Sequence, residues 1–365
     1  MDKALIIIVP FVLSLVLCRA AMTLKIMDAP DGARKTQAVP VPRTGGLGLC
    51  AAVLLSLAGF VVWLGFDLAE FVGVLVANRL AGPVIYLLGL AVIGFLDDVV
   101  TLPALFKFVL IWGLCLIAAA YGPSPQNVWL PMFGETGIGN VVAVGGAALW
   151  LFVVANSVNF MDGSNGLSMG SSAVFFLVAA VLLSPFAGVS WEANYIVGLF
   201  SVALMVSAAI AGFLVWNLQG RIYAGDMGAL FTGGLMGVFG LLIGQFYSIW
   251  LAPLLVLPFI ADVLLTMQLR ARRGENLLAP HREHAYQLLL RTGWQHGKVA
   301  VVWWGLVAVC GAAALIAVKV PLMRGQVSQI HALSLAVFVA ALMLSVTLWM
   351  IQRKTLGKAL ERDGL

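Results

Sequence analysis

The chain has 365 residues, of which 62% are hydrophobic and only 10% are charged. Its mean hydropathy of +1.04 lies far outside the soluble range and excludes a soluble domain. The formal net charge of +5 does not indicate nucleic-acid binding, because the basic residues follow the loops on one side of a membrane.

Long apolar runs follow one another along the whole chain. Each has about the length of roughly 18 to 22 residues that crosses the hydrocarbon core as a helix. The first run resembles a signal peptide, but no A-x-A-like cleavage site follows it, so we expect a retained helix. The sequence predicts an all-α integral membrane protein, one polytopic domain over residues 1–365. Its eleven transmembrane helices are expected at 4–18, 46–66, 80–96, 104–121, 137–156, 166–184, 194–216, 227–246, 249–269, 299–318 and 331–351.

Basic residues alternate sharply between the predicted loops. Most of them lie in segments 19–45 and 270–298, at Lys107 and Arg221, and in the tail after residue 352. By the positive-inside rule, these segments are cytoplasmic. The N-terminus is then outside and the C-terminus inside, which agrees with an odd number of spans.

Nearly all unusual polar residues lie at the predicted cytoplasmic ends of these helices. The first such stretch is "VPVPRTGGLGL" (39–49), which contains Arg43 and is rich in glycine at a helix start. Free backbone N–H groups at such a start can bind an anion. A plain junction between loop and helix is the competing interpretation. The expected active-site loops are about 19–45, 97–107, 156–166, 217–227 and 270–298.

Adjacent carboxylates end the third span, in "GFLDDVVTLPALFKF" (94–108). Asp97 and Asp98 are costly at a membrane boundary unless they face water, a cation or a basic partner. Such a pair holds Mg²⁺, or shares a proton so that one carboxylate acts as a base. Lys107 can reach a phosphate as a flexible point charge. The competing interpretation is a solvated helix end and a snorkelling lysine.

Four Asx residues recur every three positions in "NSVNFMDGSNGL" (156–167), and they are Asn156, Asn159, Asp162 and Asn165. Their oxygens suit hard cations, and amides also read the edge of a nucleobase. Gly163 and Gly166 permit the tight turns that bring such groups together. A helix cap needs fewer Asx residues, so the pattern favours a binding site.

The loop before the eighth span, "NLQGRIYAGDMG", carries Asn217, Arg221, Tyr223 and Asp226. A carboxylate between glycines at a helix start suits a Mg²⁺ that bridges phosphates. Tyr223 is a candidate for stacking on a base, although an interfacial tyrosine without such a role is the more common case.

The most basic loop, "APHREHAYQLLLRTGWQHGK" (279–298), contains His281, Arg282 and His284. A zinc pair lacks a third ligand at suitable spacing, so a phosphate-binding cluster is favoured over it. A basic loop that only sets topology is the competing interpretation. Asp262, within a predicted span, is a functional candidate without an assigned role.

Taken together, five blocks resemble a known family in order and separation. The chain resembles the polyprenyl-phosphate N-acetylhexosamine-1-phosphate transferases of the MraY/WecA superfamily, which is glycosyltransferase family 4. The resemblance covers about residues 40 to 300. The loop "HREHAYQ" is most similar to the WbpL-like branch, whereas Ala229 stands where many relatives carry serine. The blocks are "PRTGGLG", "DDVVTLPALFK", "NSVNFMDGSNGL", "NLQGRIYAGDMG" and "HREHAYQ".

This resemblance implies a Mg²⁺-dependent enzyme, with Mn²⁺ as a substitute. Asp226 matches the principal Mg²⁺ ligand, and Asn159 matches an amide that joins it. Asp97 and Asp98 match paired carboxylates that serve as a base or organise metal and phosphate. Lys107 matches the lysine on the diphosphate.

Further matches concern the two substrates. Asn165 and Tyr223 match positions that pair with and stack on uracil. The basic loop over the phosphates and sugar is expected to use His281, Arg282 and His284. Other substrate contacts are expected from Arg43, Asn156, Asp162, Asn217 and Arg221.

The expected reaction moves a HexNAc-1-phosphate, or a 6-deoxy-HexNAc-1-phosphate, from a UDP-sugar to undecaprenyl phosphate and releases UMP. It would initiate O-antigen or other envelope polysaccharide synthesis at the cytoplasmic face of the bacterial inner membrane. The sugar, a homodimer, and direct or two-step transfer are left open. The alternative is a polytopic transporter of an anionic or nucleotide-linked substrate. Such proteins usually place their charges near the midplane.

Overall fold

The computed structural model describes residues 4–28, 40–184, 193–277, 279 and 281–362. Residues 29–39 of the predicted active-site loop 19–45 therefore lie outside the described residues. In chain order, the elements are α1 (Leu5–Ala21), η1 (Met22–Leu24), β1 (Met27–Asp28), β2 (Val41–Pro42), α2 (Gly45–Trp63), α3 (Leu68–Ala77), α4 (Ala81–Val100), α5 (Ala104–Ala120), β3 (Asn127–Leu130), β4 (Gly134–Gly137), α6 (Asn140–Phe160), α7 (Leu167–Leu183), α8 (Ala193–Asn217), α9 (Gly225–Phe246), α10 (Leu251–Leu255), α11 (Leu257–Arg272), α12 (Ala285–Arg291), α13 (His296–Met323) and α14 (Gln329–Arg362).

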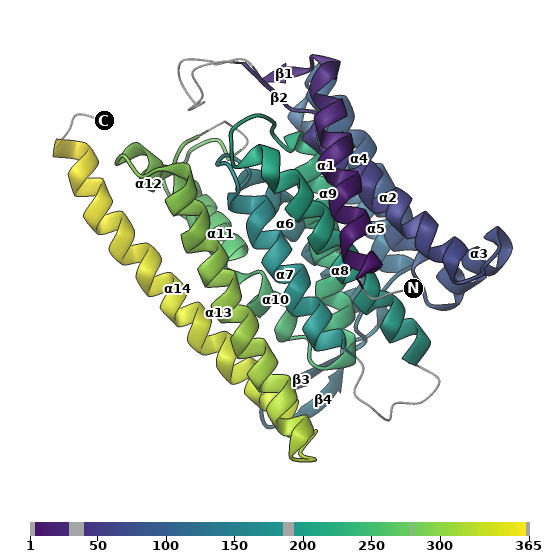
Figure 1. The fold of residues 1–365 in the computed structure, drawn as a ribbon. Coiled ribbons are helices and arrows are strands. Elements are labelled where there is room, and N and C mark those ends of the chain that lie inside the picture. The colour runs from purple at the N-terminus through teal and green to yellow at the C-terminus, as the bar shows by residue number, and fades with distance from the viewer. Residues whose placement is uncertain (1–3, 29–39, 185–192, 278, 280, 363–365) are drawn as a thin grey trace.

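The described chain is helical apart from two small antiparallel hairpins, which the all-α prediction did not include. In one hairpin, Met27 pairs with Pro42 and Asp28 with Val41. The other joins β3 to β4. The hairpins lie at opposite ends of the helical bundle (Figure 1).

Every expected span is helical, but not every one is a single long helix. Eight helices in the described residues are long and apolar enough to cross a membrane. The helices α5 and α7 are apolar but have only 17 residues each. The expected span 249–269 is divided at Val256 into α10 and α11. Pro258, at the start of α11, lacks the N–H that would continue the preceding helix. The number of spans therefore stays a prediction.

A helix that the hydropathy pattern did not predict, α3, lies at one edge of the bundle (Figure 1). Asp67 accepts a hydrogen bond from the backbone N–H of Glu70 at 2.8 Å, and the Glu70 carboxylate accepts one from the Asp67 N–H at 3.0 Å. This reciprocal capping box was visible in the sequence as D-x-x-E.

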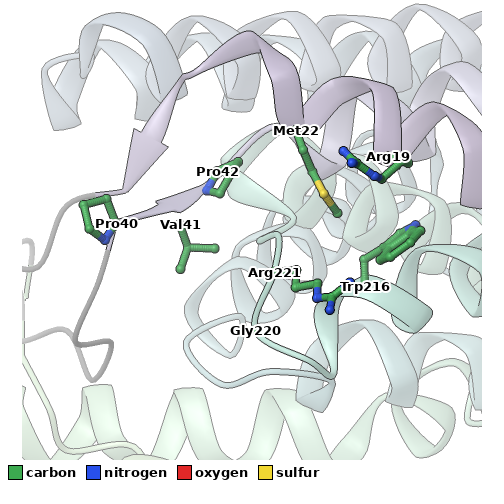
Figure 2. Close-up of a pocket in the computed structure, with 8 residues that line it drawn as sticks. All are labelled: Arg19, Met22, Pro40, Val41, Pro42, Trp216, Gly220 and Arg221. Carbon is green, nitrogen blue, oxygen red and sulfur yellow. The ribbon is translucent and has the colours of Figure 1, made fainter.

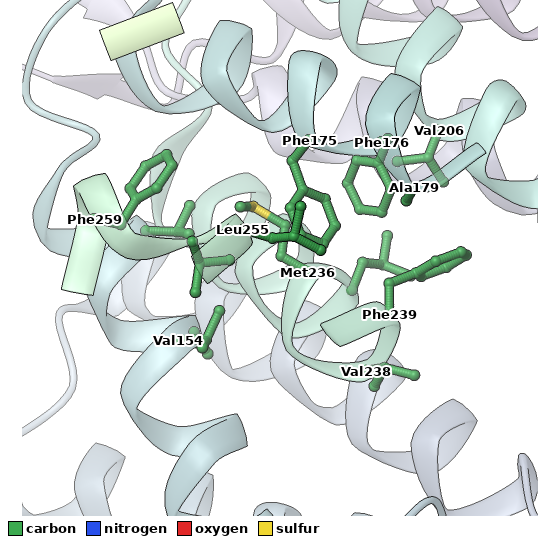
Figure 3. Packing of buried hydrophobic residues seen from close by; sticks show 14 of the residues in the cluster. Val154, Phe175, Phe176, Ala179, Val206, Met236, Val238, Phe239, Leu255 and Phe259 are labelled. Atoms are coloured by element: carbon green, nitrogen blue, oxygen red, sulfur yellow. The ribbon is translucent and has the colours of Figure 1, made fainter. Parts of the chain in front are cut away.

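The centre of the bundle is α9, whose residues from Gly228 to Gly244 are all buried. It packs against α2, α4, α6 and α7. Its many glycines let neighbouring backbones approach closely, as where Gly228 faces Gly46 of α2. Figure 3 shows the aromatic side of this core, where Phe176 of α7 meets Phe239 of α9 edge to face at 5.5 Å.

The helical chain begins and ends at opposite ends of the bundle. In Figure 1, α1 leads up to the β1–β2 hairpin, and α14 finishes at that same end. This arrangement matches an odd number of spans. Which end faces the cytoplasm stays a prediction.

Candidate active site

A lysine bridges two carboxylates where α4 ends and α5 and α9 begin. The Lys107 ammonium lies 2.9 Å from Asp97 Oδ2 and also donates to the Asp226 carboxylate. Asp97 in addition accepts the backbone N–H of Leu102 at 2.6 Å. The Asp226 side chain is 30% exposed against 16% for Asp97, so Asp226 is the carboxylate more open to a ligand.

The neighbouring Asp98 points elsewhere and caps α9. Its two carboxylate oxygens accept the backbone N–H groups of Asp226 at 3.0 Å and Met227 at 3.1 Å. A carboxylate at a helix N-terminus satisfies otherwise unpaired donors and complements the helix dipole. The two adjacent acids therefore have different structural roles. Asp97 pairs with Lys107, whereas Asp98 fixes the backbone at Asp226.

We expect Asp98→Asn to lower both stability and turnover. The amide NH₂ cannot accept the second backbone N–H, and a buried donor left unpaired costs about 1–3 kcal/mol. Since the unpaired donor lies next to Asp226, UMP release should also fall, by about tenfold to a hundredfold. Thermal unfolding in detergent and the rate of UMP release check this. Glu135→Gln, a change at an exposed acid in the β3–β4 hairpin, is the control because it leaves the cap intact; equal thermal midpoints for the two variants would contradict the assignment.

The glycine-rich stretch at the start of α2 is bonded to the chain itself. The Gly45 N–H donates to Tyr223 O at 2.9 Å and the Gly46 N–H donates to Ala224 O at 2.8 Å. These two amides are therefore not free to bind an anion, and the stretch instead holds the loop before Asp226. Arg43 forms an ion pair with Asp28, and its second guanidinium nitrogen lies 3.8 Å from Asp98.

The Asx-rich stretch spans the end of α6 and the turn to α7. The Asn156 amide donates to the Phe152 carbonyl at 2.8 Å, a contact within its own helix. Asn159 is half-buried, and its side chain makes no hydrogen bond to the part of the chain that the structure describes. Asp162 accepts a hydrogen bond from Ser168. Burial, together with the charges of Asp226 and Asp98, raises the pKa of Asp162 to about 7.

This raised pKa predicts a pH-dependent stability. Stability from protonated Asp162 is fully present below its unfolded pKa and is lost as the pH rises through the folded value near 7. We expect Asp162→Asn, which keeps an acceptor for Ser168, to exceed the wild type by a few degrees in thermal midpoint at about pH 8. At about pH 4 the two proteins should match. Melting curves without divalent ions at both pH values check this, and a variant less stable at pH 8 would contradict it.

Asn217 ties this stretch to the loop before α9. Its Oδ1 accepts the Gly166 N–H at 2.7 Å, and its Nδ2 donates to Ile222 O at 2.9 Å. Asn217 is buried, so the structure gives it a bridging contact between two predicted loops. The Trp304 indole completes the support by donating to Gly166 O at 2.8 Å.

Tyr286 is a supporting residue that sequence reasoning missed. Its hydroxyl donates to Phe160 O at 3.2 Å and lies where a side chain on Gly163 would be. Gly163 is thus needed for this close approach. The tyrosine is the second residue after the "HREH" letters, so its position beside a predicted phosphate loop was the available signal.

A cavity lies beside these loops and away from Lys107 and its two carboxylate partners. It has a volume of about 340 Å³ and contains one predicted site residue, Arg221, whose guanidinium lies 5.8 Å from the centre of the Trp216 ring. Asn165 borders this region, since its amide nitrogen lies against Gly220. Figure 2 shows the lining residues, which are Arg19, Met22, Pro40, Val41, Pro42, Trp216, Gly220 and Arg221.

Tyr223 lies between this region and Asp226. Its N–H donates to Pro42 O at 2.8 Å, and its side chain is half-buried. Burial and the charge of Asp28 raise the pKa of its phenol, so it is neutral at pH 7.

The basic loop lies against the Asx-rich stretch. The His284 ring stacks 6.2 Å from the ring of Phe160, the last residue of α6, and 4.9 Å from His281. Burial, together with the neighbouring His281 and Arg353, lowers the pKa of His284 to about 3. Burial, with the charge of Arg270, also lowers the pKa of His281. Both imidazoles are therefore neutral at pH 7, and Arg282 is the cation among the three predicted residues.

A family model for "Glycosyl transferase family 4" matches residues 80–244, the segment that contains Lys107 and its two carboxylate partners. A relative from Bacillus subtilis (strain 168), named "Probable undecaprenyl-phosphate N-acetylglucosaminyl 1-phosphate transferase", is 26% identical over 319 residues, 82% of each chain. These similarities support membership of the MraY/WecA superfamily. The WbpL-like branch stays a prediction.

Other relatives of this chain carry a different name. The phospho-N-acetylmuramoyl-pentapeptide-transferase of Acetivibrio thermocellus is 28% identical over 256 residues, 61% of this chain and 69% of that one. The enzyme of the same name from Arthrobacter sp. (strain FB24) is 26% identical over 328 residues, 75% and 84% of the two chains. Similarity to both groups shows the superfamily but not the sugar.

The oxygen donors of this candidate site fit Mg²⁺. No group of three or more His, Cys, Asp or Glu side chains in the described segments is arranged to hold a metal. Mg²⁺, however, is usually bound by one or two carboxylates together with substrate phosphates. Asp226 is partly exposed, the Asn159 amide oxygen accepts no hydrogen bond from the described residues, and Lys107 already supplies one positive charge between Asp226 and Asp97.

Proposed function

We propose that this chain transfers an N-acetylhexosamine-1-phosphate, or its 6-deoxy form, from a UDP-sugar to undecaprenyl phosphate and releases UMP. The reaction would start O-antigen or other envelope polysaccharide synthesis at the cytoplasmic face of the bacterial inner membrane. The observation that carries the proposal is the Lys107 bridge between Asp97 and Asp226 at one end of an apolar bundle. The names of the relatives support the same reaction class.

The chain supplies charge where the reaction needs it. Phosphoryl transfer depends mainly on positioning and on neutralising charge around the transferred group. Lys107 and Arg282 would bind the diphosphate oxygens of the UDP-sugar. Mg²⁺, held by Asp226 and Asn159 with substrate oxygens, would add Lewis-acid neutralisation of that diphosphate.

The transfer itself exchanges one P–O bond for another. An oxygen of the acceptor phosphate attacks the β-phosphorus, and the bond from that phosphorus to the bridging oxygen breaks, so that oxygen leaves on UMP. Asp97 would hold the acceptor in line or take its proton. Asp98 is committed to the helix cap by two backbone hydrogen bonds, which leaves Asp97 as the candidate base. We favour direct attack over an aspartyl-phosphate intermediate, because both charged substrates meet at the interface.

The nucleoside end would lie toward Asn165 and Tyr223. An amide can hydrogen-bond the uracil edge, and a half-buried phenol ring offers a face for stacking. Asn217 would act indirectly, because both ends of its amide are bonded to the loops around it. A transporter would place its polar groups near the midplane, whereas these lie at helix ends.

A panel of UDP-sugars tests this proposal. Purified protein with undecaprenyl phosphate and Mg²⁺ should release UMP from at least one of UDP-GlcNAc, UDP-GalNAc, UDP-FucNAc and UDP-QuiNAc. The preferred sugar then names the substrate. Absence of UMP from all four, with uptake of intact nucleotide sugar into vesicles, would favour the transporter.

A further inference from the structure

Asp262, the buried carboxylate without a sequence-based role, fixes the start of α12. Its oxygens accept the backbone N–H of Ala285 at 2.9 and 3.0 Å. Thr266 at 3.2 Å and the Trp349 indole at 3.3 Å donate to it as well. Ala285 follows His284 directly in the chain. The position of the basic loop is therefore set from within the bundle.

Glu283, the acidic residue inside the basic loop, pairs with arginines at the end of α11 and in α14. Arg270 lies 2.7 Å from its carboxylate, Arg273 also pairs with it, and Arg353 approaches within 3.8 Å. Burial alone would raise the pKa of Glu283, but hydrogen bonds from Arg273 and Arg270 lower it, so it is ionised and compensated.

The last helix closes this support from the other side. Arg353 of α14 donates to the Glu283 carbonyl and, at 3.0 Å, to Thr266 Oγ1. Its guanidinium lies 4.5 Å from the centre of the Trp349 ring. The next residue toward the N-terminus, Gln352, donates to Ala285 O at 2.9 Å. The end of α14 thus packs against α12 and α11 (Figure 1). Its side chains donate to the backbone carbonyls of Glu283 and Ala285, the residues on either side of His284.

The neighbouring charges of Glu283 and Arg282 therefore have different partners. Because the Glu283 carboxylate pairs with three arginines from α11 and α14, it does not neutralise its neighbour Arg282. Arg282 forms no ion pair with the described residues, and its buried Nε has no hydrogen-bond partner among them. A guanidinium without an ion pair, two residues before the His284 that stacks on Phe160, is available for an anion.

We propose that the inner end of α14 is a positioning clamp for this loop: Arg353, with Asp262 and Glu283, orients Arg282 toward the diphosphate of the nucleotide sugar. Arg353 is a positioning residue, since it acts through Arg282. The identity of the ligand rests on the proposed function, whereas the contacts that position the loop do not. The loop geometry and the role in binding are therefore tested separately.

The geometry is tested by hydrogen exchange on the full-length protein. In Arg353→Gln, backbone amides of residues 281–291 should exchange at least about tenfold faster than in the wild type, because opening of the loop loses its side-chain anchors. Lys354→Gln is the matched control, since Lys354 is exposed on the same turn and its side chain forms no hydrogen bond or ion pair with the described residues. Equal exchange in Arg353→Gln and Lys354→Gln would overturn the clamp.

The role is tested by kinetics with the preferred UDP-sugar. Arg353→Gln should raise its KM by about tenfold, change kcat less than about threefold and leave the KM for undecaprenyl phosphate unchanged. A merely structural defect would lower kcat through the active fraction and leave KM alone. Arg353→Lys should recover part of the lost affinity. An unchanged KM despite faster exchange would overturn the positioning role, whereas a wild type without UMP release would overturn only the proposed function.

Discussion

Asp226→Asn should reduce UMP release by at least about a thousandfold, the scale on which loss of a principal charge-stabilising group acts. The substitution keeps the shape of the side chain but removes the charge that holds Lys107 and suits Mg²⁺. The cap from Asp98 contacts only the backbone at this position, so α9 should remain intact.

Single-turnover UMP release measures this effect, with the thermal midpoint as the check on folding. The matched control is Glu135→Gln, an exposed acid in the β3–β4 hairpin at the other end of the bundle. A folded Asp226→Asn protein with turnover close to that of the control would remove Asp226 from the chemistry.

Lys107→Met should impair both turnover and stability. Asp97 and Asp226 share this single ammonium, and its loss leaves two neighbouring carboxylates without their cation. Breaking a fully buried pair costs about 3–5 kcal/mol, and the partial exposure of these groups places the expected loss below that range. UMP release should fall by about a hundredfold or more.

A distinguishing feature of Lys107→Met is its response to metal. Because Mg²⁺ can replace the missing positive charge between the carboxylates, it should raise the melting temperature of the variant more than that of the wild type. Lys354→Met serves as the control for loss of a lysine. If Mg²⁺ stabilises all three proteins equally, the acidic cluster is not the metal site.

The periodic and apolar signals in the sequence located the helices well. Each expected run is helical because apolar length is a property of the segment itself. The break at Val256 was missed, although Pro258 signals it, because hydropathy does not register a missing N–H. The helix α3 was missed because its signal is the capping pair Asp67 and Glu70, not an apolar run of membrane length.

The sequence predicted which residues form the candidate site, but it did not predict the different contact that each one makes. Asp97 and Asp98 look equivalent in sequence, and only the position of α9 shows that one caps a helix while the other pairs with Lys107. The sequence predicted Asn217 as a substrate ligand, whereas its hydrogen bonds to the distant Gly166 and to Ile222 show that it links two loops. Contacts between distant segments cannot be derived from local spacing.

The fate of the β-phosphate tests the central claim most directly. With UDP-GlcNAc, or the preferred sugar, labelled at the β-phosphorus, the purified protein and undecaprenyl phosphate should place the label in the lipid product and release unlabelled UMP. Label that remains in released UDP would show sugar transfer without phosphate. Label that crosses a vesicle membrane in an intact nucleotide sugar would show transport, and either result would contradict the proposed function.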